Sequence, residues 1–274
     1  YVVEGNLAGA HRSPFHGPSS EFADHKAYGI GDDPKNIDWR VVARTDKYYV
    51  KRFQDETNLR VYLVVDRSAS MAFGGGDCTK YAFACRLAVA LGYVVVKGRD
   101  AVGLALHADK IDVMTEAHNS LVHLNNIVKS LRRYEPASTT RIAGALHEVA
   151  EKVGRRALIV VISDLLGDEE EFRMALAHLR KRHHDVMVMQ VLDPNELNLN
   201  YEKTCEFVDL ETADRLVVNP RGLAGEYQRV FGEFLKSIQE YCSGLKADYR
   251  LACTDQSLET FVRAYLGERS RLAK

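Results

Sequence analysis

The sequence predicts an α/β protein with a doubly wound, mainly parallel β-sheet that is flanked by helices. Short apolar runs rich in β-branched residues recur along the chain, at residues 59–65, 101–106, 159–162 and 186–189. Such runs are typical of strands buried on both faces of a parallel sheet. Longer segments whose apolar residues recur with helical spacing lie between them. Strands that alternate with helices in this way favour a parallel sheet with crossover connections.

The composition fits one large globular domain with an appendage. The chain has 274 residues, of which 46% are hydrophobic and 27% are charged. These values are ordinary for a globular fold. The net charge of −1 does not favour broad electrostatic binding to nucleic acid or to a membrane surface. We therefore expect neither as a partner of this chain.

Residues 1–58 are predicted to form a loop and strand extension that packs on the main domain, residues 59–274. Glycine and proline recur between positions 5 and 34 and make this stretch rich in loops. Its apolar residues are too few to build a separate core. The extension therefore needs the surface of the main domain.

The cysteines and the hydropathy pattern indicate a reducing cytoplasm as the setting. The five cysteines are odd in number, widely spaced and without a C-x-x-C pair. That pattern argues against a disulfide framework and against a zinc site. No apolar run approaches the ~20 residues of a membrane helix, and no signal peptide is visible. An anchor ahead of residue 1 is left open.

The first half of the main domain is predicted to alternate strands with helices. Asp77 is placed to cap the first helix, and Gly98 to end it. The predicted elements are strand 59–65, helix 77–97, strand 101–106, antiparallel edge strand 110–114, helix 119–133, and a helix that starts at Thr140 and ends at Gly154.

The second half continues the alternation. Three glutamates open the helix that begins at Glu169, and a basic run at 180–184 closes it, which complements the helix dipole. Asp193 and Pro194 then turn the chain. The predicted elements are strand 159–162, helix 169–183, strand 185–192, a hairpin of 207–210 with 215–218, helix 225–243, strand 247–254 and helix 257–266.

Polar residues follow two of the predicted buried strands. Asp66, Ser68 and Ser70 come directly after strand 59–65, and Asp164 follows strand 159–162. Ligands of open α/β sheets bind just beyond the carboxyl ends of the strands. Carboxylate and hydroxyl oxygens suit a hard cation such as Mg²⁺, and Thr140 offers a further hydroxyl at a helix start. From the first stretch alone, an Asx-type turn that caps the next helix explains the residues equally well.

The order Asp-x-Ser-x-Ser, then Thr, then Asp resembles the metal-ion-dependent adhesion site of the von Willebrand factor A fold. Its five ligand positions are matched by Asp66, Ser68, Ser70, Thr140 and Asp164. The resemblance implies a Rossmann-like topology and a bound Mg²⁺, or another divalent cation such as Mn²⁺ or Ca²⁺. It also implies that one or both aspartates act through a bound water.

Stretches over nearly the whole chain resemble the bacterial family called Domain of Unknown Function 58. They include residues 28–34, 37–40, 68–74, 100–104, 191–194 and 254–255. Two departures are Arg99, where members often carry glycine, and His107, where an aromatic residue is common. The resemblance implies an association with AAA+ ATPases of the MoxR type.

These expectations together indicate a metal-dependent protein-interaction module rather than an enzyme. An Asp or Glu of the partner would complete the coordination shell of the metal. One alternative is a Mg²⁺-dependent phosphatase-like enzyme with Asp66 as nucleophile, although such enzymes need a second acid where this chain has Ser68. Neither a P-loop nor a G-x-S-x-G sequence is present. Another alternative is a structural scaffold with an unused site.

Overall fold

The structure is a computed structural model that describes residues 21–29, 37–54, 59–74, 78–137, 139, 141–199, 201 and 203–264. Contacts within the chain divide it into two compact units, residues 1–58 and residues 59–274. That the first unit packs on the second stays a prediction.

The described residues of the N-terminal unit form a short antiparallel sheet and one helix. Strand β1 (Glu21–Ala27) pairs with β2 (Tyr49–Gln54), and helix α1 (Trp39–Thr45) lies between them in sequence. The side chain of Asp38 accepts a hydrogen bond from the backbone N–H of Arg40 at 3.0 Å. It thereby satisfies a free donor in the first turn of the helix.

The second unit is built on a six-stranded sheet, in which only the edge strand β5 is antiparallel. The strand order is β10-β7-β6-β3-β4-β5. The strands are β3 (Arg60–Asp66), β4 (Ala101–His107), β5 (Ile111–His118), β6 (Leu158–Ser163), β7 (Asp185–Leu192) and β10 (Asp248–Cys253). Every residue of β6 is buried, as expected for a strand covered on both faces.

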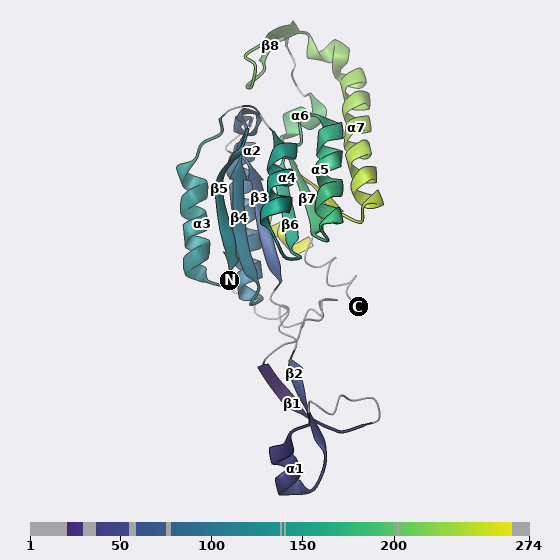
Figure 1. The fold of residues 1–274 in the computed structure, drawn as a ribbon. Helices are drawn as coiled ribbons and strands as arrows, with labels where there is room; N and C mark the ends of the chain where they lie inside the picture. The colour runs from purple at the N-terminus through teal and green to yellow at the C-terminus, as the bar shows by residue number, and fades with distance from the viewer. Residues whose placement is uncertain are drawn as a thin grey trace. The chain divides into compact units, whose positions relative to one another are not determined.

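Helices cover both faces of this sheet. On one face, α2 (Lys80–Lys97) and α3 (Leu121–Arg133) share a core with alternate strand residues such as Leu63 and Val65. On the other, α4 (Ile142–Lys152), α5 (Glu169–Lys181) and α7 (Pro220–Gly244) lie side by side (Figure 1) and belong to the core cluster that contains Tyr62 and Val64. The predicted doubly wound α/β class is confirmed.

Short elements complete the second unit. The 3-10 helix η2 (Ala69–Ala72) follows β3, and helix α6 (Pro194–Asn198) follows β7. Strands β8 (Cys205–Val208) and β9 (Arg215–Val218) form the predicted hairpin ahead of α7. All five cysteines are free thiols. None of the helices within the described residues is both long and apolar enough to cross a membrane.

Several predicted boundaries were wrong. Helix α7 begins at Pro220 rather than at Gly225, and β5 ends at His118 rather than at Met114. Two other errors concern the start of α2 and the end of β7. Helix α2 begins at Lys80, capped by the hydroxyl of Thr79, which accepts from Ala82 N at 3.1 Å. The predicted cap, Asp77, lies outside the described residues. After Asp193, a capping box forms a short helix where only a turn was predicted, because Glu196 accepts from Asp193 N while Asp193 accepts from Asn195 N.

The turn between α5 and β7 contains a buried histidine, His184. Because of it, we expect the stability of the folded chain to fall in acid. Neither ring nitrogen of His184 has a hydrogen-bond partner among the described residues. Burial, and next the nearby Arg182 guanidinium, lower the pKa of His184. Below about pH 6.5 the unfolded chain therefore binds a proton that the folded chain does not, so stability falls by up to about 1.4 kcal/mol per pH unit.

We expect His184→Gln to weaken the dependence of stability on pH between 7 and 5, measured by urea denaturation. The matched control is His183→Asn, because His183 is exposed and a positive φ of 65° favours asparagine there. An unchanged slope in His184→Gln would contradict this assignment.

Candidate functional site

The order in which the chain adds strands to the sheet reverses at β3. The chain passes from β3 to β4 on one side, and it returns later as β6 on the other side of β3. In open α/β sheets, ligands bind outside the carboxyl ends of the strands at such a reversal. Asp66 is the last residue of β3, and Asp164 directly follows β6. Both predicted aspartates therefore lie at the expected position.

Hydrogen bonds from both strand ends hold the Asp66 carboxylate, which is fully buried. Its Oδ1 accepts from Ser68 N at 2.8 Å, and its Oδ2 accepts from Ser163 Oγ at 2.6 Å. Ser163 Oγ in turn accepts from Leu165 N at 3.0 Å. Ser163 was not predicted as a site residue, although its place next to Asp164 could have marked it.

The two serine hydroxyls lie together beyond β3. Ser68 Oγ and Ser70 Oγ are 3.0 Å apart, with Ser68 buried and Ser70 half-buried. Octahedral Mg²⁺ binds oxygens at about 2.0–2.1 Å, which sets neighbouring ligands about 3.0 Å apart. The separation therefore suits either a hydrogen bond between the hydroxyls or two adjacent ligands of one ion.

The fifth predicted ligand, Thr140, lies outside the described residues. The backbone on either side of it is attached to the ends of β3 and β4. Ala137 N donates to Arg67 O at 2.9 Å, and Arg141 N donates to Ala108 O at 3.1 Å. These bonds place the two flanking positions at the carboxyl edge of the sheet.

Asp164 lies in a buried ion pair that the sequence did not reveal. Lys80 Nζ is 2.7 Å from Asp164 Oδ2 and 2.5 Å from Glu196 Oε1. The side chains of Lys80 and Asp164 have no exposed area. Burial alone would lower the pKa of Lys80, but the negative charges of Asp164 and Glu196 outweigh it and raise that pKa. The lysine is therefore a permanent cation inside the site.

Glu196 connects the ion pair to the surrounding elements. Its Oε2 accepts from Asp193 N at 2.9 Å, and its backbone carbonyl accepts from Tyr227 Oη at 2.6 Å. Asp193 in turn accepts from Thr254 Oγ1 at 3.1 Å. The end of β7, helix α6, helix α7 and the end of β10 are thus joined around one glutamate.

His107 adds a buried nitrogen beside Asp66. The two residues are register partners on β4 and β3, so their side chains lie on the same face of the sheet. His107 is fully buried, and its Nε2 has no hydrogen-bond partner among the described residues. Buried polar atoms in folded proteins are nearly always satisfied by protein, water or a ligand. This orphaned atom indicates that a water or another polar group lies beside His107.

The donor set fits a hard divalent cation. Hydroxyl and carboxylate oxygens suit Mg²⁺, Mn²⁺ or Ca²⁺, whereas Zn²⁺ prefers nitrogen and sulfur. Within the described residues, no group of three or more His, Cys, Asp and Glu side chains is arranged to hold a metal. Any ion at this site therefore depends on the hydroxyls of Ser68, Ser70 and Thr140.

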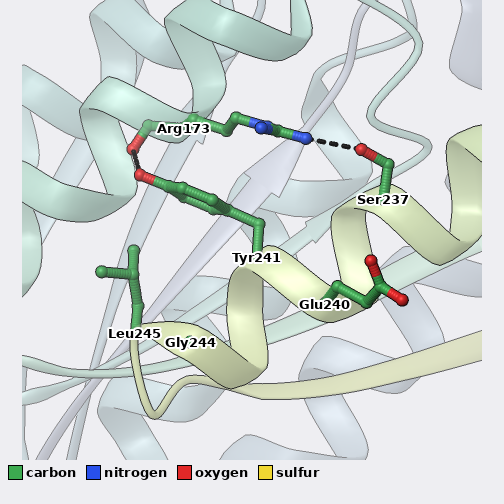
Figure 2. A pocket seen from close by; sticks show the side chains of 6 residues that line it. All are labelled: Arg173, Ser237, Glu240, Tyr241, Gly244 and Leu245. Carbon is green, nitrogen blue, oxygen red and sulfur yellow. Dashed lines mark hydrogen bonds between the residues drawn. The ribbon is translucent and has the colours of Figure 1, made fainter.

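A cavity lies between α5 and α7 (Figure 2). It is lined by Arg173, Ser237, Glu240, Tyr241, Gly244 and Leu245. The Arg173 guanidinium stacks on the Tyr241 ring at 4.9 Å and donates to Ser237 and Glu169, and Tyr241 Oη donates to Arg173 O at 3.0 Å. These contacts join the two helices, so we attribute the cavity to helix packing.

Comparison with known proteins identifies the family. Residues 24–230, well over half of the chain, match the family described as "Protein of unknown function DUF58". The chain belongs to the DUF58 family. The resemblance inferred from the sequence is thereby confirmed. An uncharacterised protein of Mycobacterium bovis is 29% identical over 200 residues, which cover 72% of this DUF58 chain and 62% of that relative.

One solved structure supports the fold of this DUF58 chain, and a second shows a looser likeness. BatB, a conserved hypothetical protein of Bacteroides thetaiotaomicron, matches with a TM-score of 0.50 and 20% identity, covering 78% of this chain and 98% of that chain. An aerotolerance-related membrane protein of Bacteroides fragilis matches with a TM-score of 0.49 and 19% identity, covering 74% and 94%. At these identities the likeness concerns the fold alone. The metal, its ligands and the partner stay predictions.

Proposed function

We propose that this DUF58 chain is a protein-interaction module that binds an acidic side chain of its partner through a divalent cation. Support comes from the reversal point between β3 and β6, where two serine hydroxyls 3.0 Å apart follow β3 and the buried carboxylates of Asp66 and Asp164 lie at the ends of the two strands. The single observation that carries the proposal is this oxygen-donor set at the carboxyl edge of the sheet.

The residues of the chain have separate tasks in this proposal. Ser68, Ser70 and Thr140 offer neutral oxygens. Asp66 and Asp164 supply negative charge nearby, but hydrogen bonds already engage their carboxylates. When bound, Mg²⁺ would supply a Lewis acid for a carboxylate. Neutral ligands neutralise little of its charge, so an Asp or Glu of another protein is a favourable further ligand.

The proposed partner is a MoxR-type AAA+ ATPase, for which the chain would be an adaptor. This choice rests on the family resemblance, whereas the acidic ligand rests on the geometry above. A phosphatase with Asp66 as nucleophile fits less well, because that carboxylate is fully buried and both its oxygens accept hydrogen bonds.

We expect Asp66→Asn to weaken Mg²⁺-dependent binding to a purified MoxR-type ATPase by at least about tenfold, or 1.4 kcal/mol. Asparagine has nearly the same shape and still accepts from Ser68 N, although its amide nitrogen cannot accept from Ser163 Oγ as Oδ2 does. Circular dichroism of the variant would establish that it is folded before binding is compared. Binding would be measured by calorimetry with Mg²⁺ and with a chelator. Thermal unfolding in a Mg²⁺ series would report whether the ion binds the folded chain.

The matched control is Glu170→Gln, which removes one negative charge from an exposed position on α5. It should bind as tightly as the wild type. Binding that survives the chelator, or that is equal in Asp66→Asn and the wild type, would refute the proposed function.

A further inference from the structure

We infer that Lys80 controls metal binding at this site, because its ammonium holds Asp164 out of the inner coordination sphere of a divalent cation. This inference rests on the proposed function, and it assigns a role to a residue outside the predicted ligand set. Lys80 is thus a positioning residue. With Lys80 in this position, the site is expected to bind metal weakly by itself. It is expected to bind metal more tightly when an acidic side chain of a partner is also bound.

Each carboxylate oxygen of Asp164 accepts one hydrogen bond. Oδ2 accepts from Lys80 Nζ at 2.7 Å, and Oδ1 accepts from Leu166 N at 3.2 Å. The backbone carbonyl of Asp164 also accepts from Gln190 Nε2 at 2.8 Å. A cation that takes Oδ2 as a direct ligand would share that oxygen with the Lys80 ammonium at close range, so with Lys80 in place contact through a water is favoured.

The Lys80 ammonium has favourable contacts in its present position and would lose them if it moved. Its side chain is fully buried, and Glu196 Oε1, on α6, holds the ammonium at 2.5 Å. The ring of Phe73, 5.8 Å from Nζ, is a further favourable neighbour. Moving an ammonium away from two carboxylates in a buried site is costly.

The positive charge of Lys80 also opposes metal binding at Asp164. A lysine cation in contact with Asp164 repels a second cation that approaches the same carboxylate, and the repulsion is stronger in a buried site than in water. Glu196 offsets the lysine charge but does not free the Asp164 oxygen. Metal affinity is therefore lowered, and the carboxylate of a partner supplies the ligand that Asp164 does not.

The test uses the charge-matched double variant Lys80→Met with Glu196→Gln. Both proteins carry the same net charge, so a difference reports the freed Asp164 oxygen rather than the overall field. Calorimetric titration with Mg²⁺ and with Mn²⁺ would measure affinity for the metal alone. We expect the double variant to bind either ion roughly tenfold or more tightly than the wild type.

The single variant Glu196→Gln is the control, because it keeps Lys80 on Asp164. It should bind metal no more tightly than the wild type. Circular dichroism and urea denaturation would establish that each protein is folded before titration.

Equal metal affinity in the double variant and the wild type would overturn the role of Lys80. In that case, the proposed function would still be supported if the wild type binds metal and Asp66→Asn does not. No metal binding by any of the folded proteins, even with the ATPase present, would overturn both the inference and the proposed function.

Discussion

Lys80→Met is expected to lower the free energy of unfolding by about 3–5 kcal/mol, even without metal. The substitution keeps the length of the side chain but removes its charge. Asp164, which is fully buried, and Glu196, which is nearly so, then lose the cation that each of them contacts. Carboxylates left unpaired in a buried site pay their desolvation cost without compensation. Urea denaturation at pH 7 would measure the loss.

Two further variants separate this effect from a general effect of losing a lysine. Lys97→Met changes an exposed lysine at the other end of the same helix and should shift stability by less than about 1 kcal/mol. Lys80→Met with Glu196→Gln removes one of the unpaired charges and should recover part of the loss. If Lys80→Met were as stable as Lys97→Met, the buried ion pair would not contribute as described.

The central strands and the two aspartates could be predicted because their signals are local. Residues of β3 and β6 are buried on both faces, so their sequences are continuous apolar runs that end in a polar residue. Asp66 and Asp164 follow from these runs and from the rule that ligands bind at the carboxyl ends of strands. Helix ends were less predictable, since the cap of α2 is Thr79 and not Asp77.

The ion pair could not be predicted, because its members are distant in sequence. Lys80 lies 84 residues before Asp164 and 116 residues before Glu196. Lysines and glutamates are mostly exposed, so a single sequence gives no reason to bury either one. Glu196 was also hidden by the missed helix α6, whose capping box holds its side chain at the end of β7. The predicted metal ligands were therefore visible in the sequence, but Lys80, which neutralises the charge of Asp164, was not.

Gly103→Ala is expected to destabilise the sheet by an amount near the upper end of about 1–3 kcal/mol, the range for overpacking a buried site. A Cβ at this position would lie 2.7 Å from the backbone oxygen of Thr115 and 2.9 Å from the Tyr62 ring. The register of β4 with β5 shifts between Val102 and Leu104, where two residue steps along β4 face three along β5, so Gly103 lies opposite an irregular stretch of β5. A backbone oxygen cannot rotate away, and β5 would have to move.

The control for Gly103→Ala is Gly232→Ala in the exposed middle of α7, where a new Cβ meets nothing within 4 Å. There alanine should raise the unfolding free energy by about 0.5–1 kcal/mol, because glycine loses more backbone entropy on folding. The same chemical change is thus expected to have opposite signs at two positions of one chain. Thermal and urea unfolding of both variants would decide it. Gly103→Ala at or above wild-type stability would mean that the β4–β5 edge yields to one methyl group, and that this close approach does not require glycine.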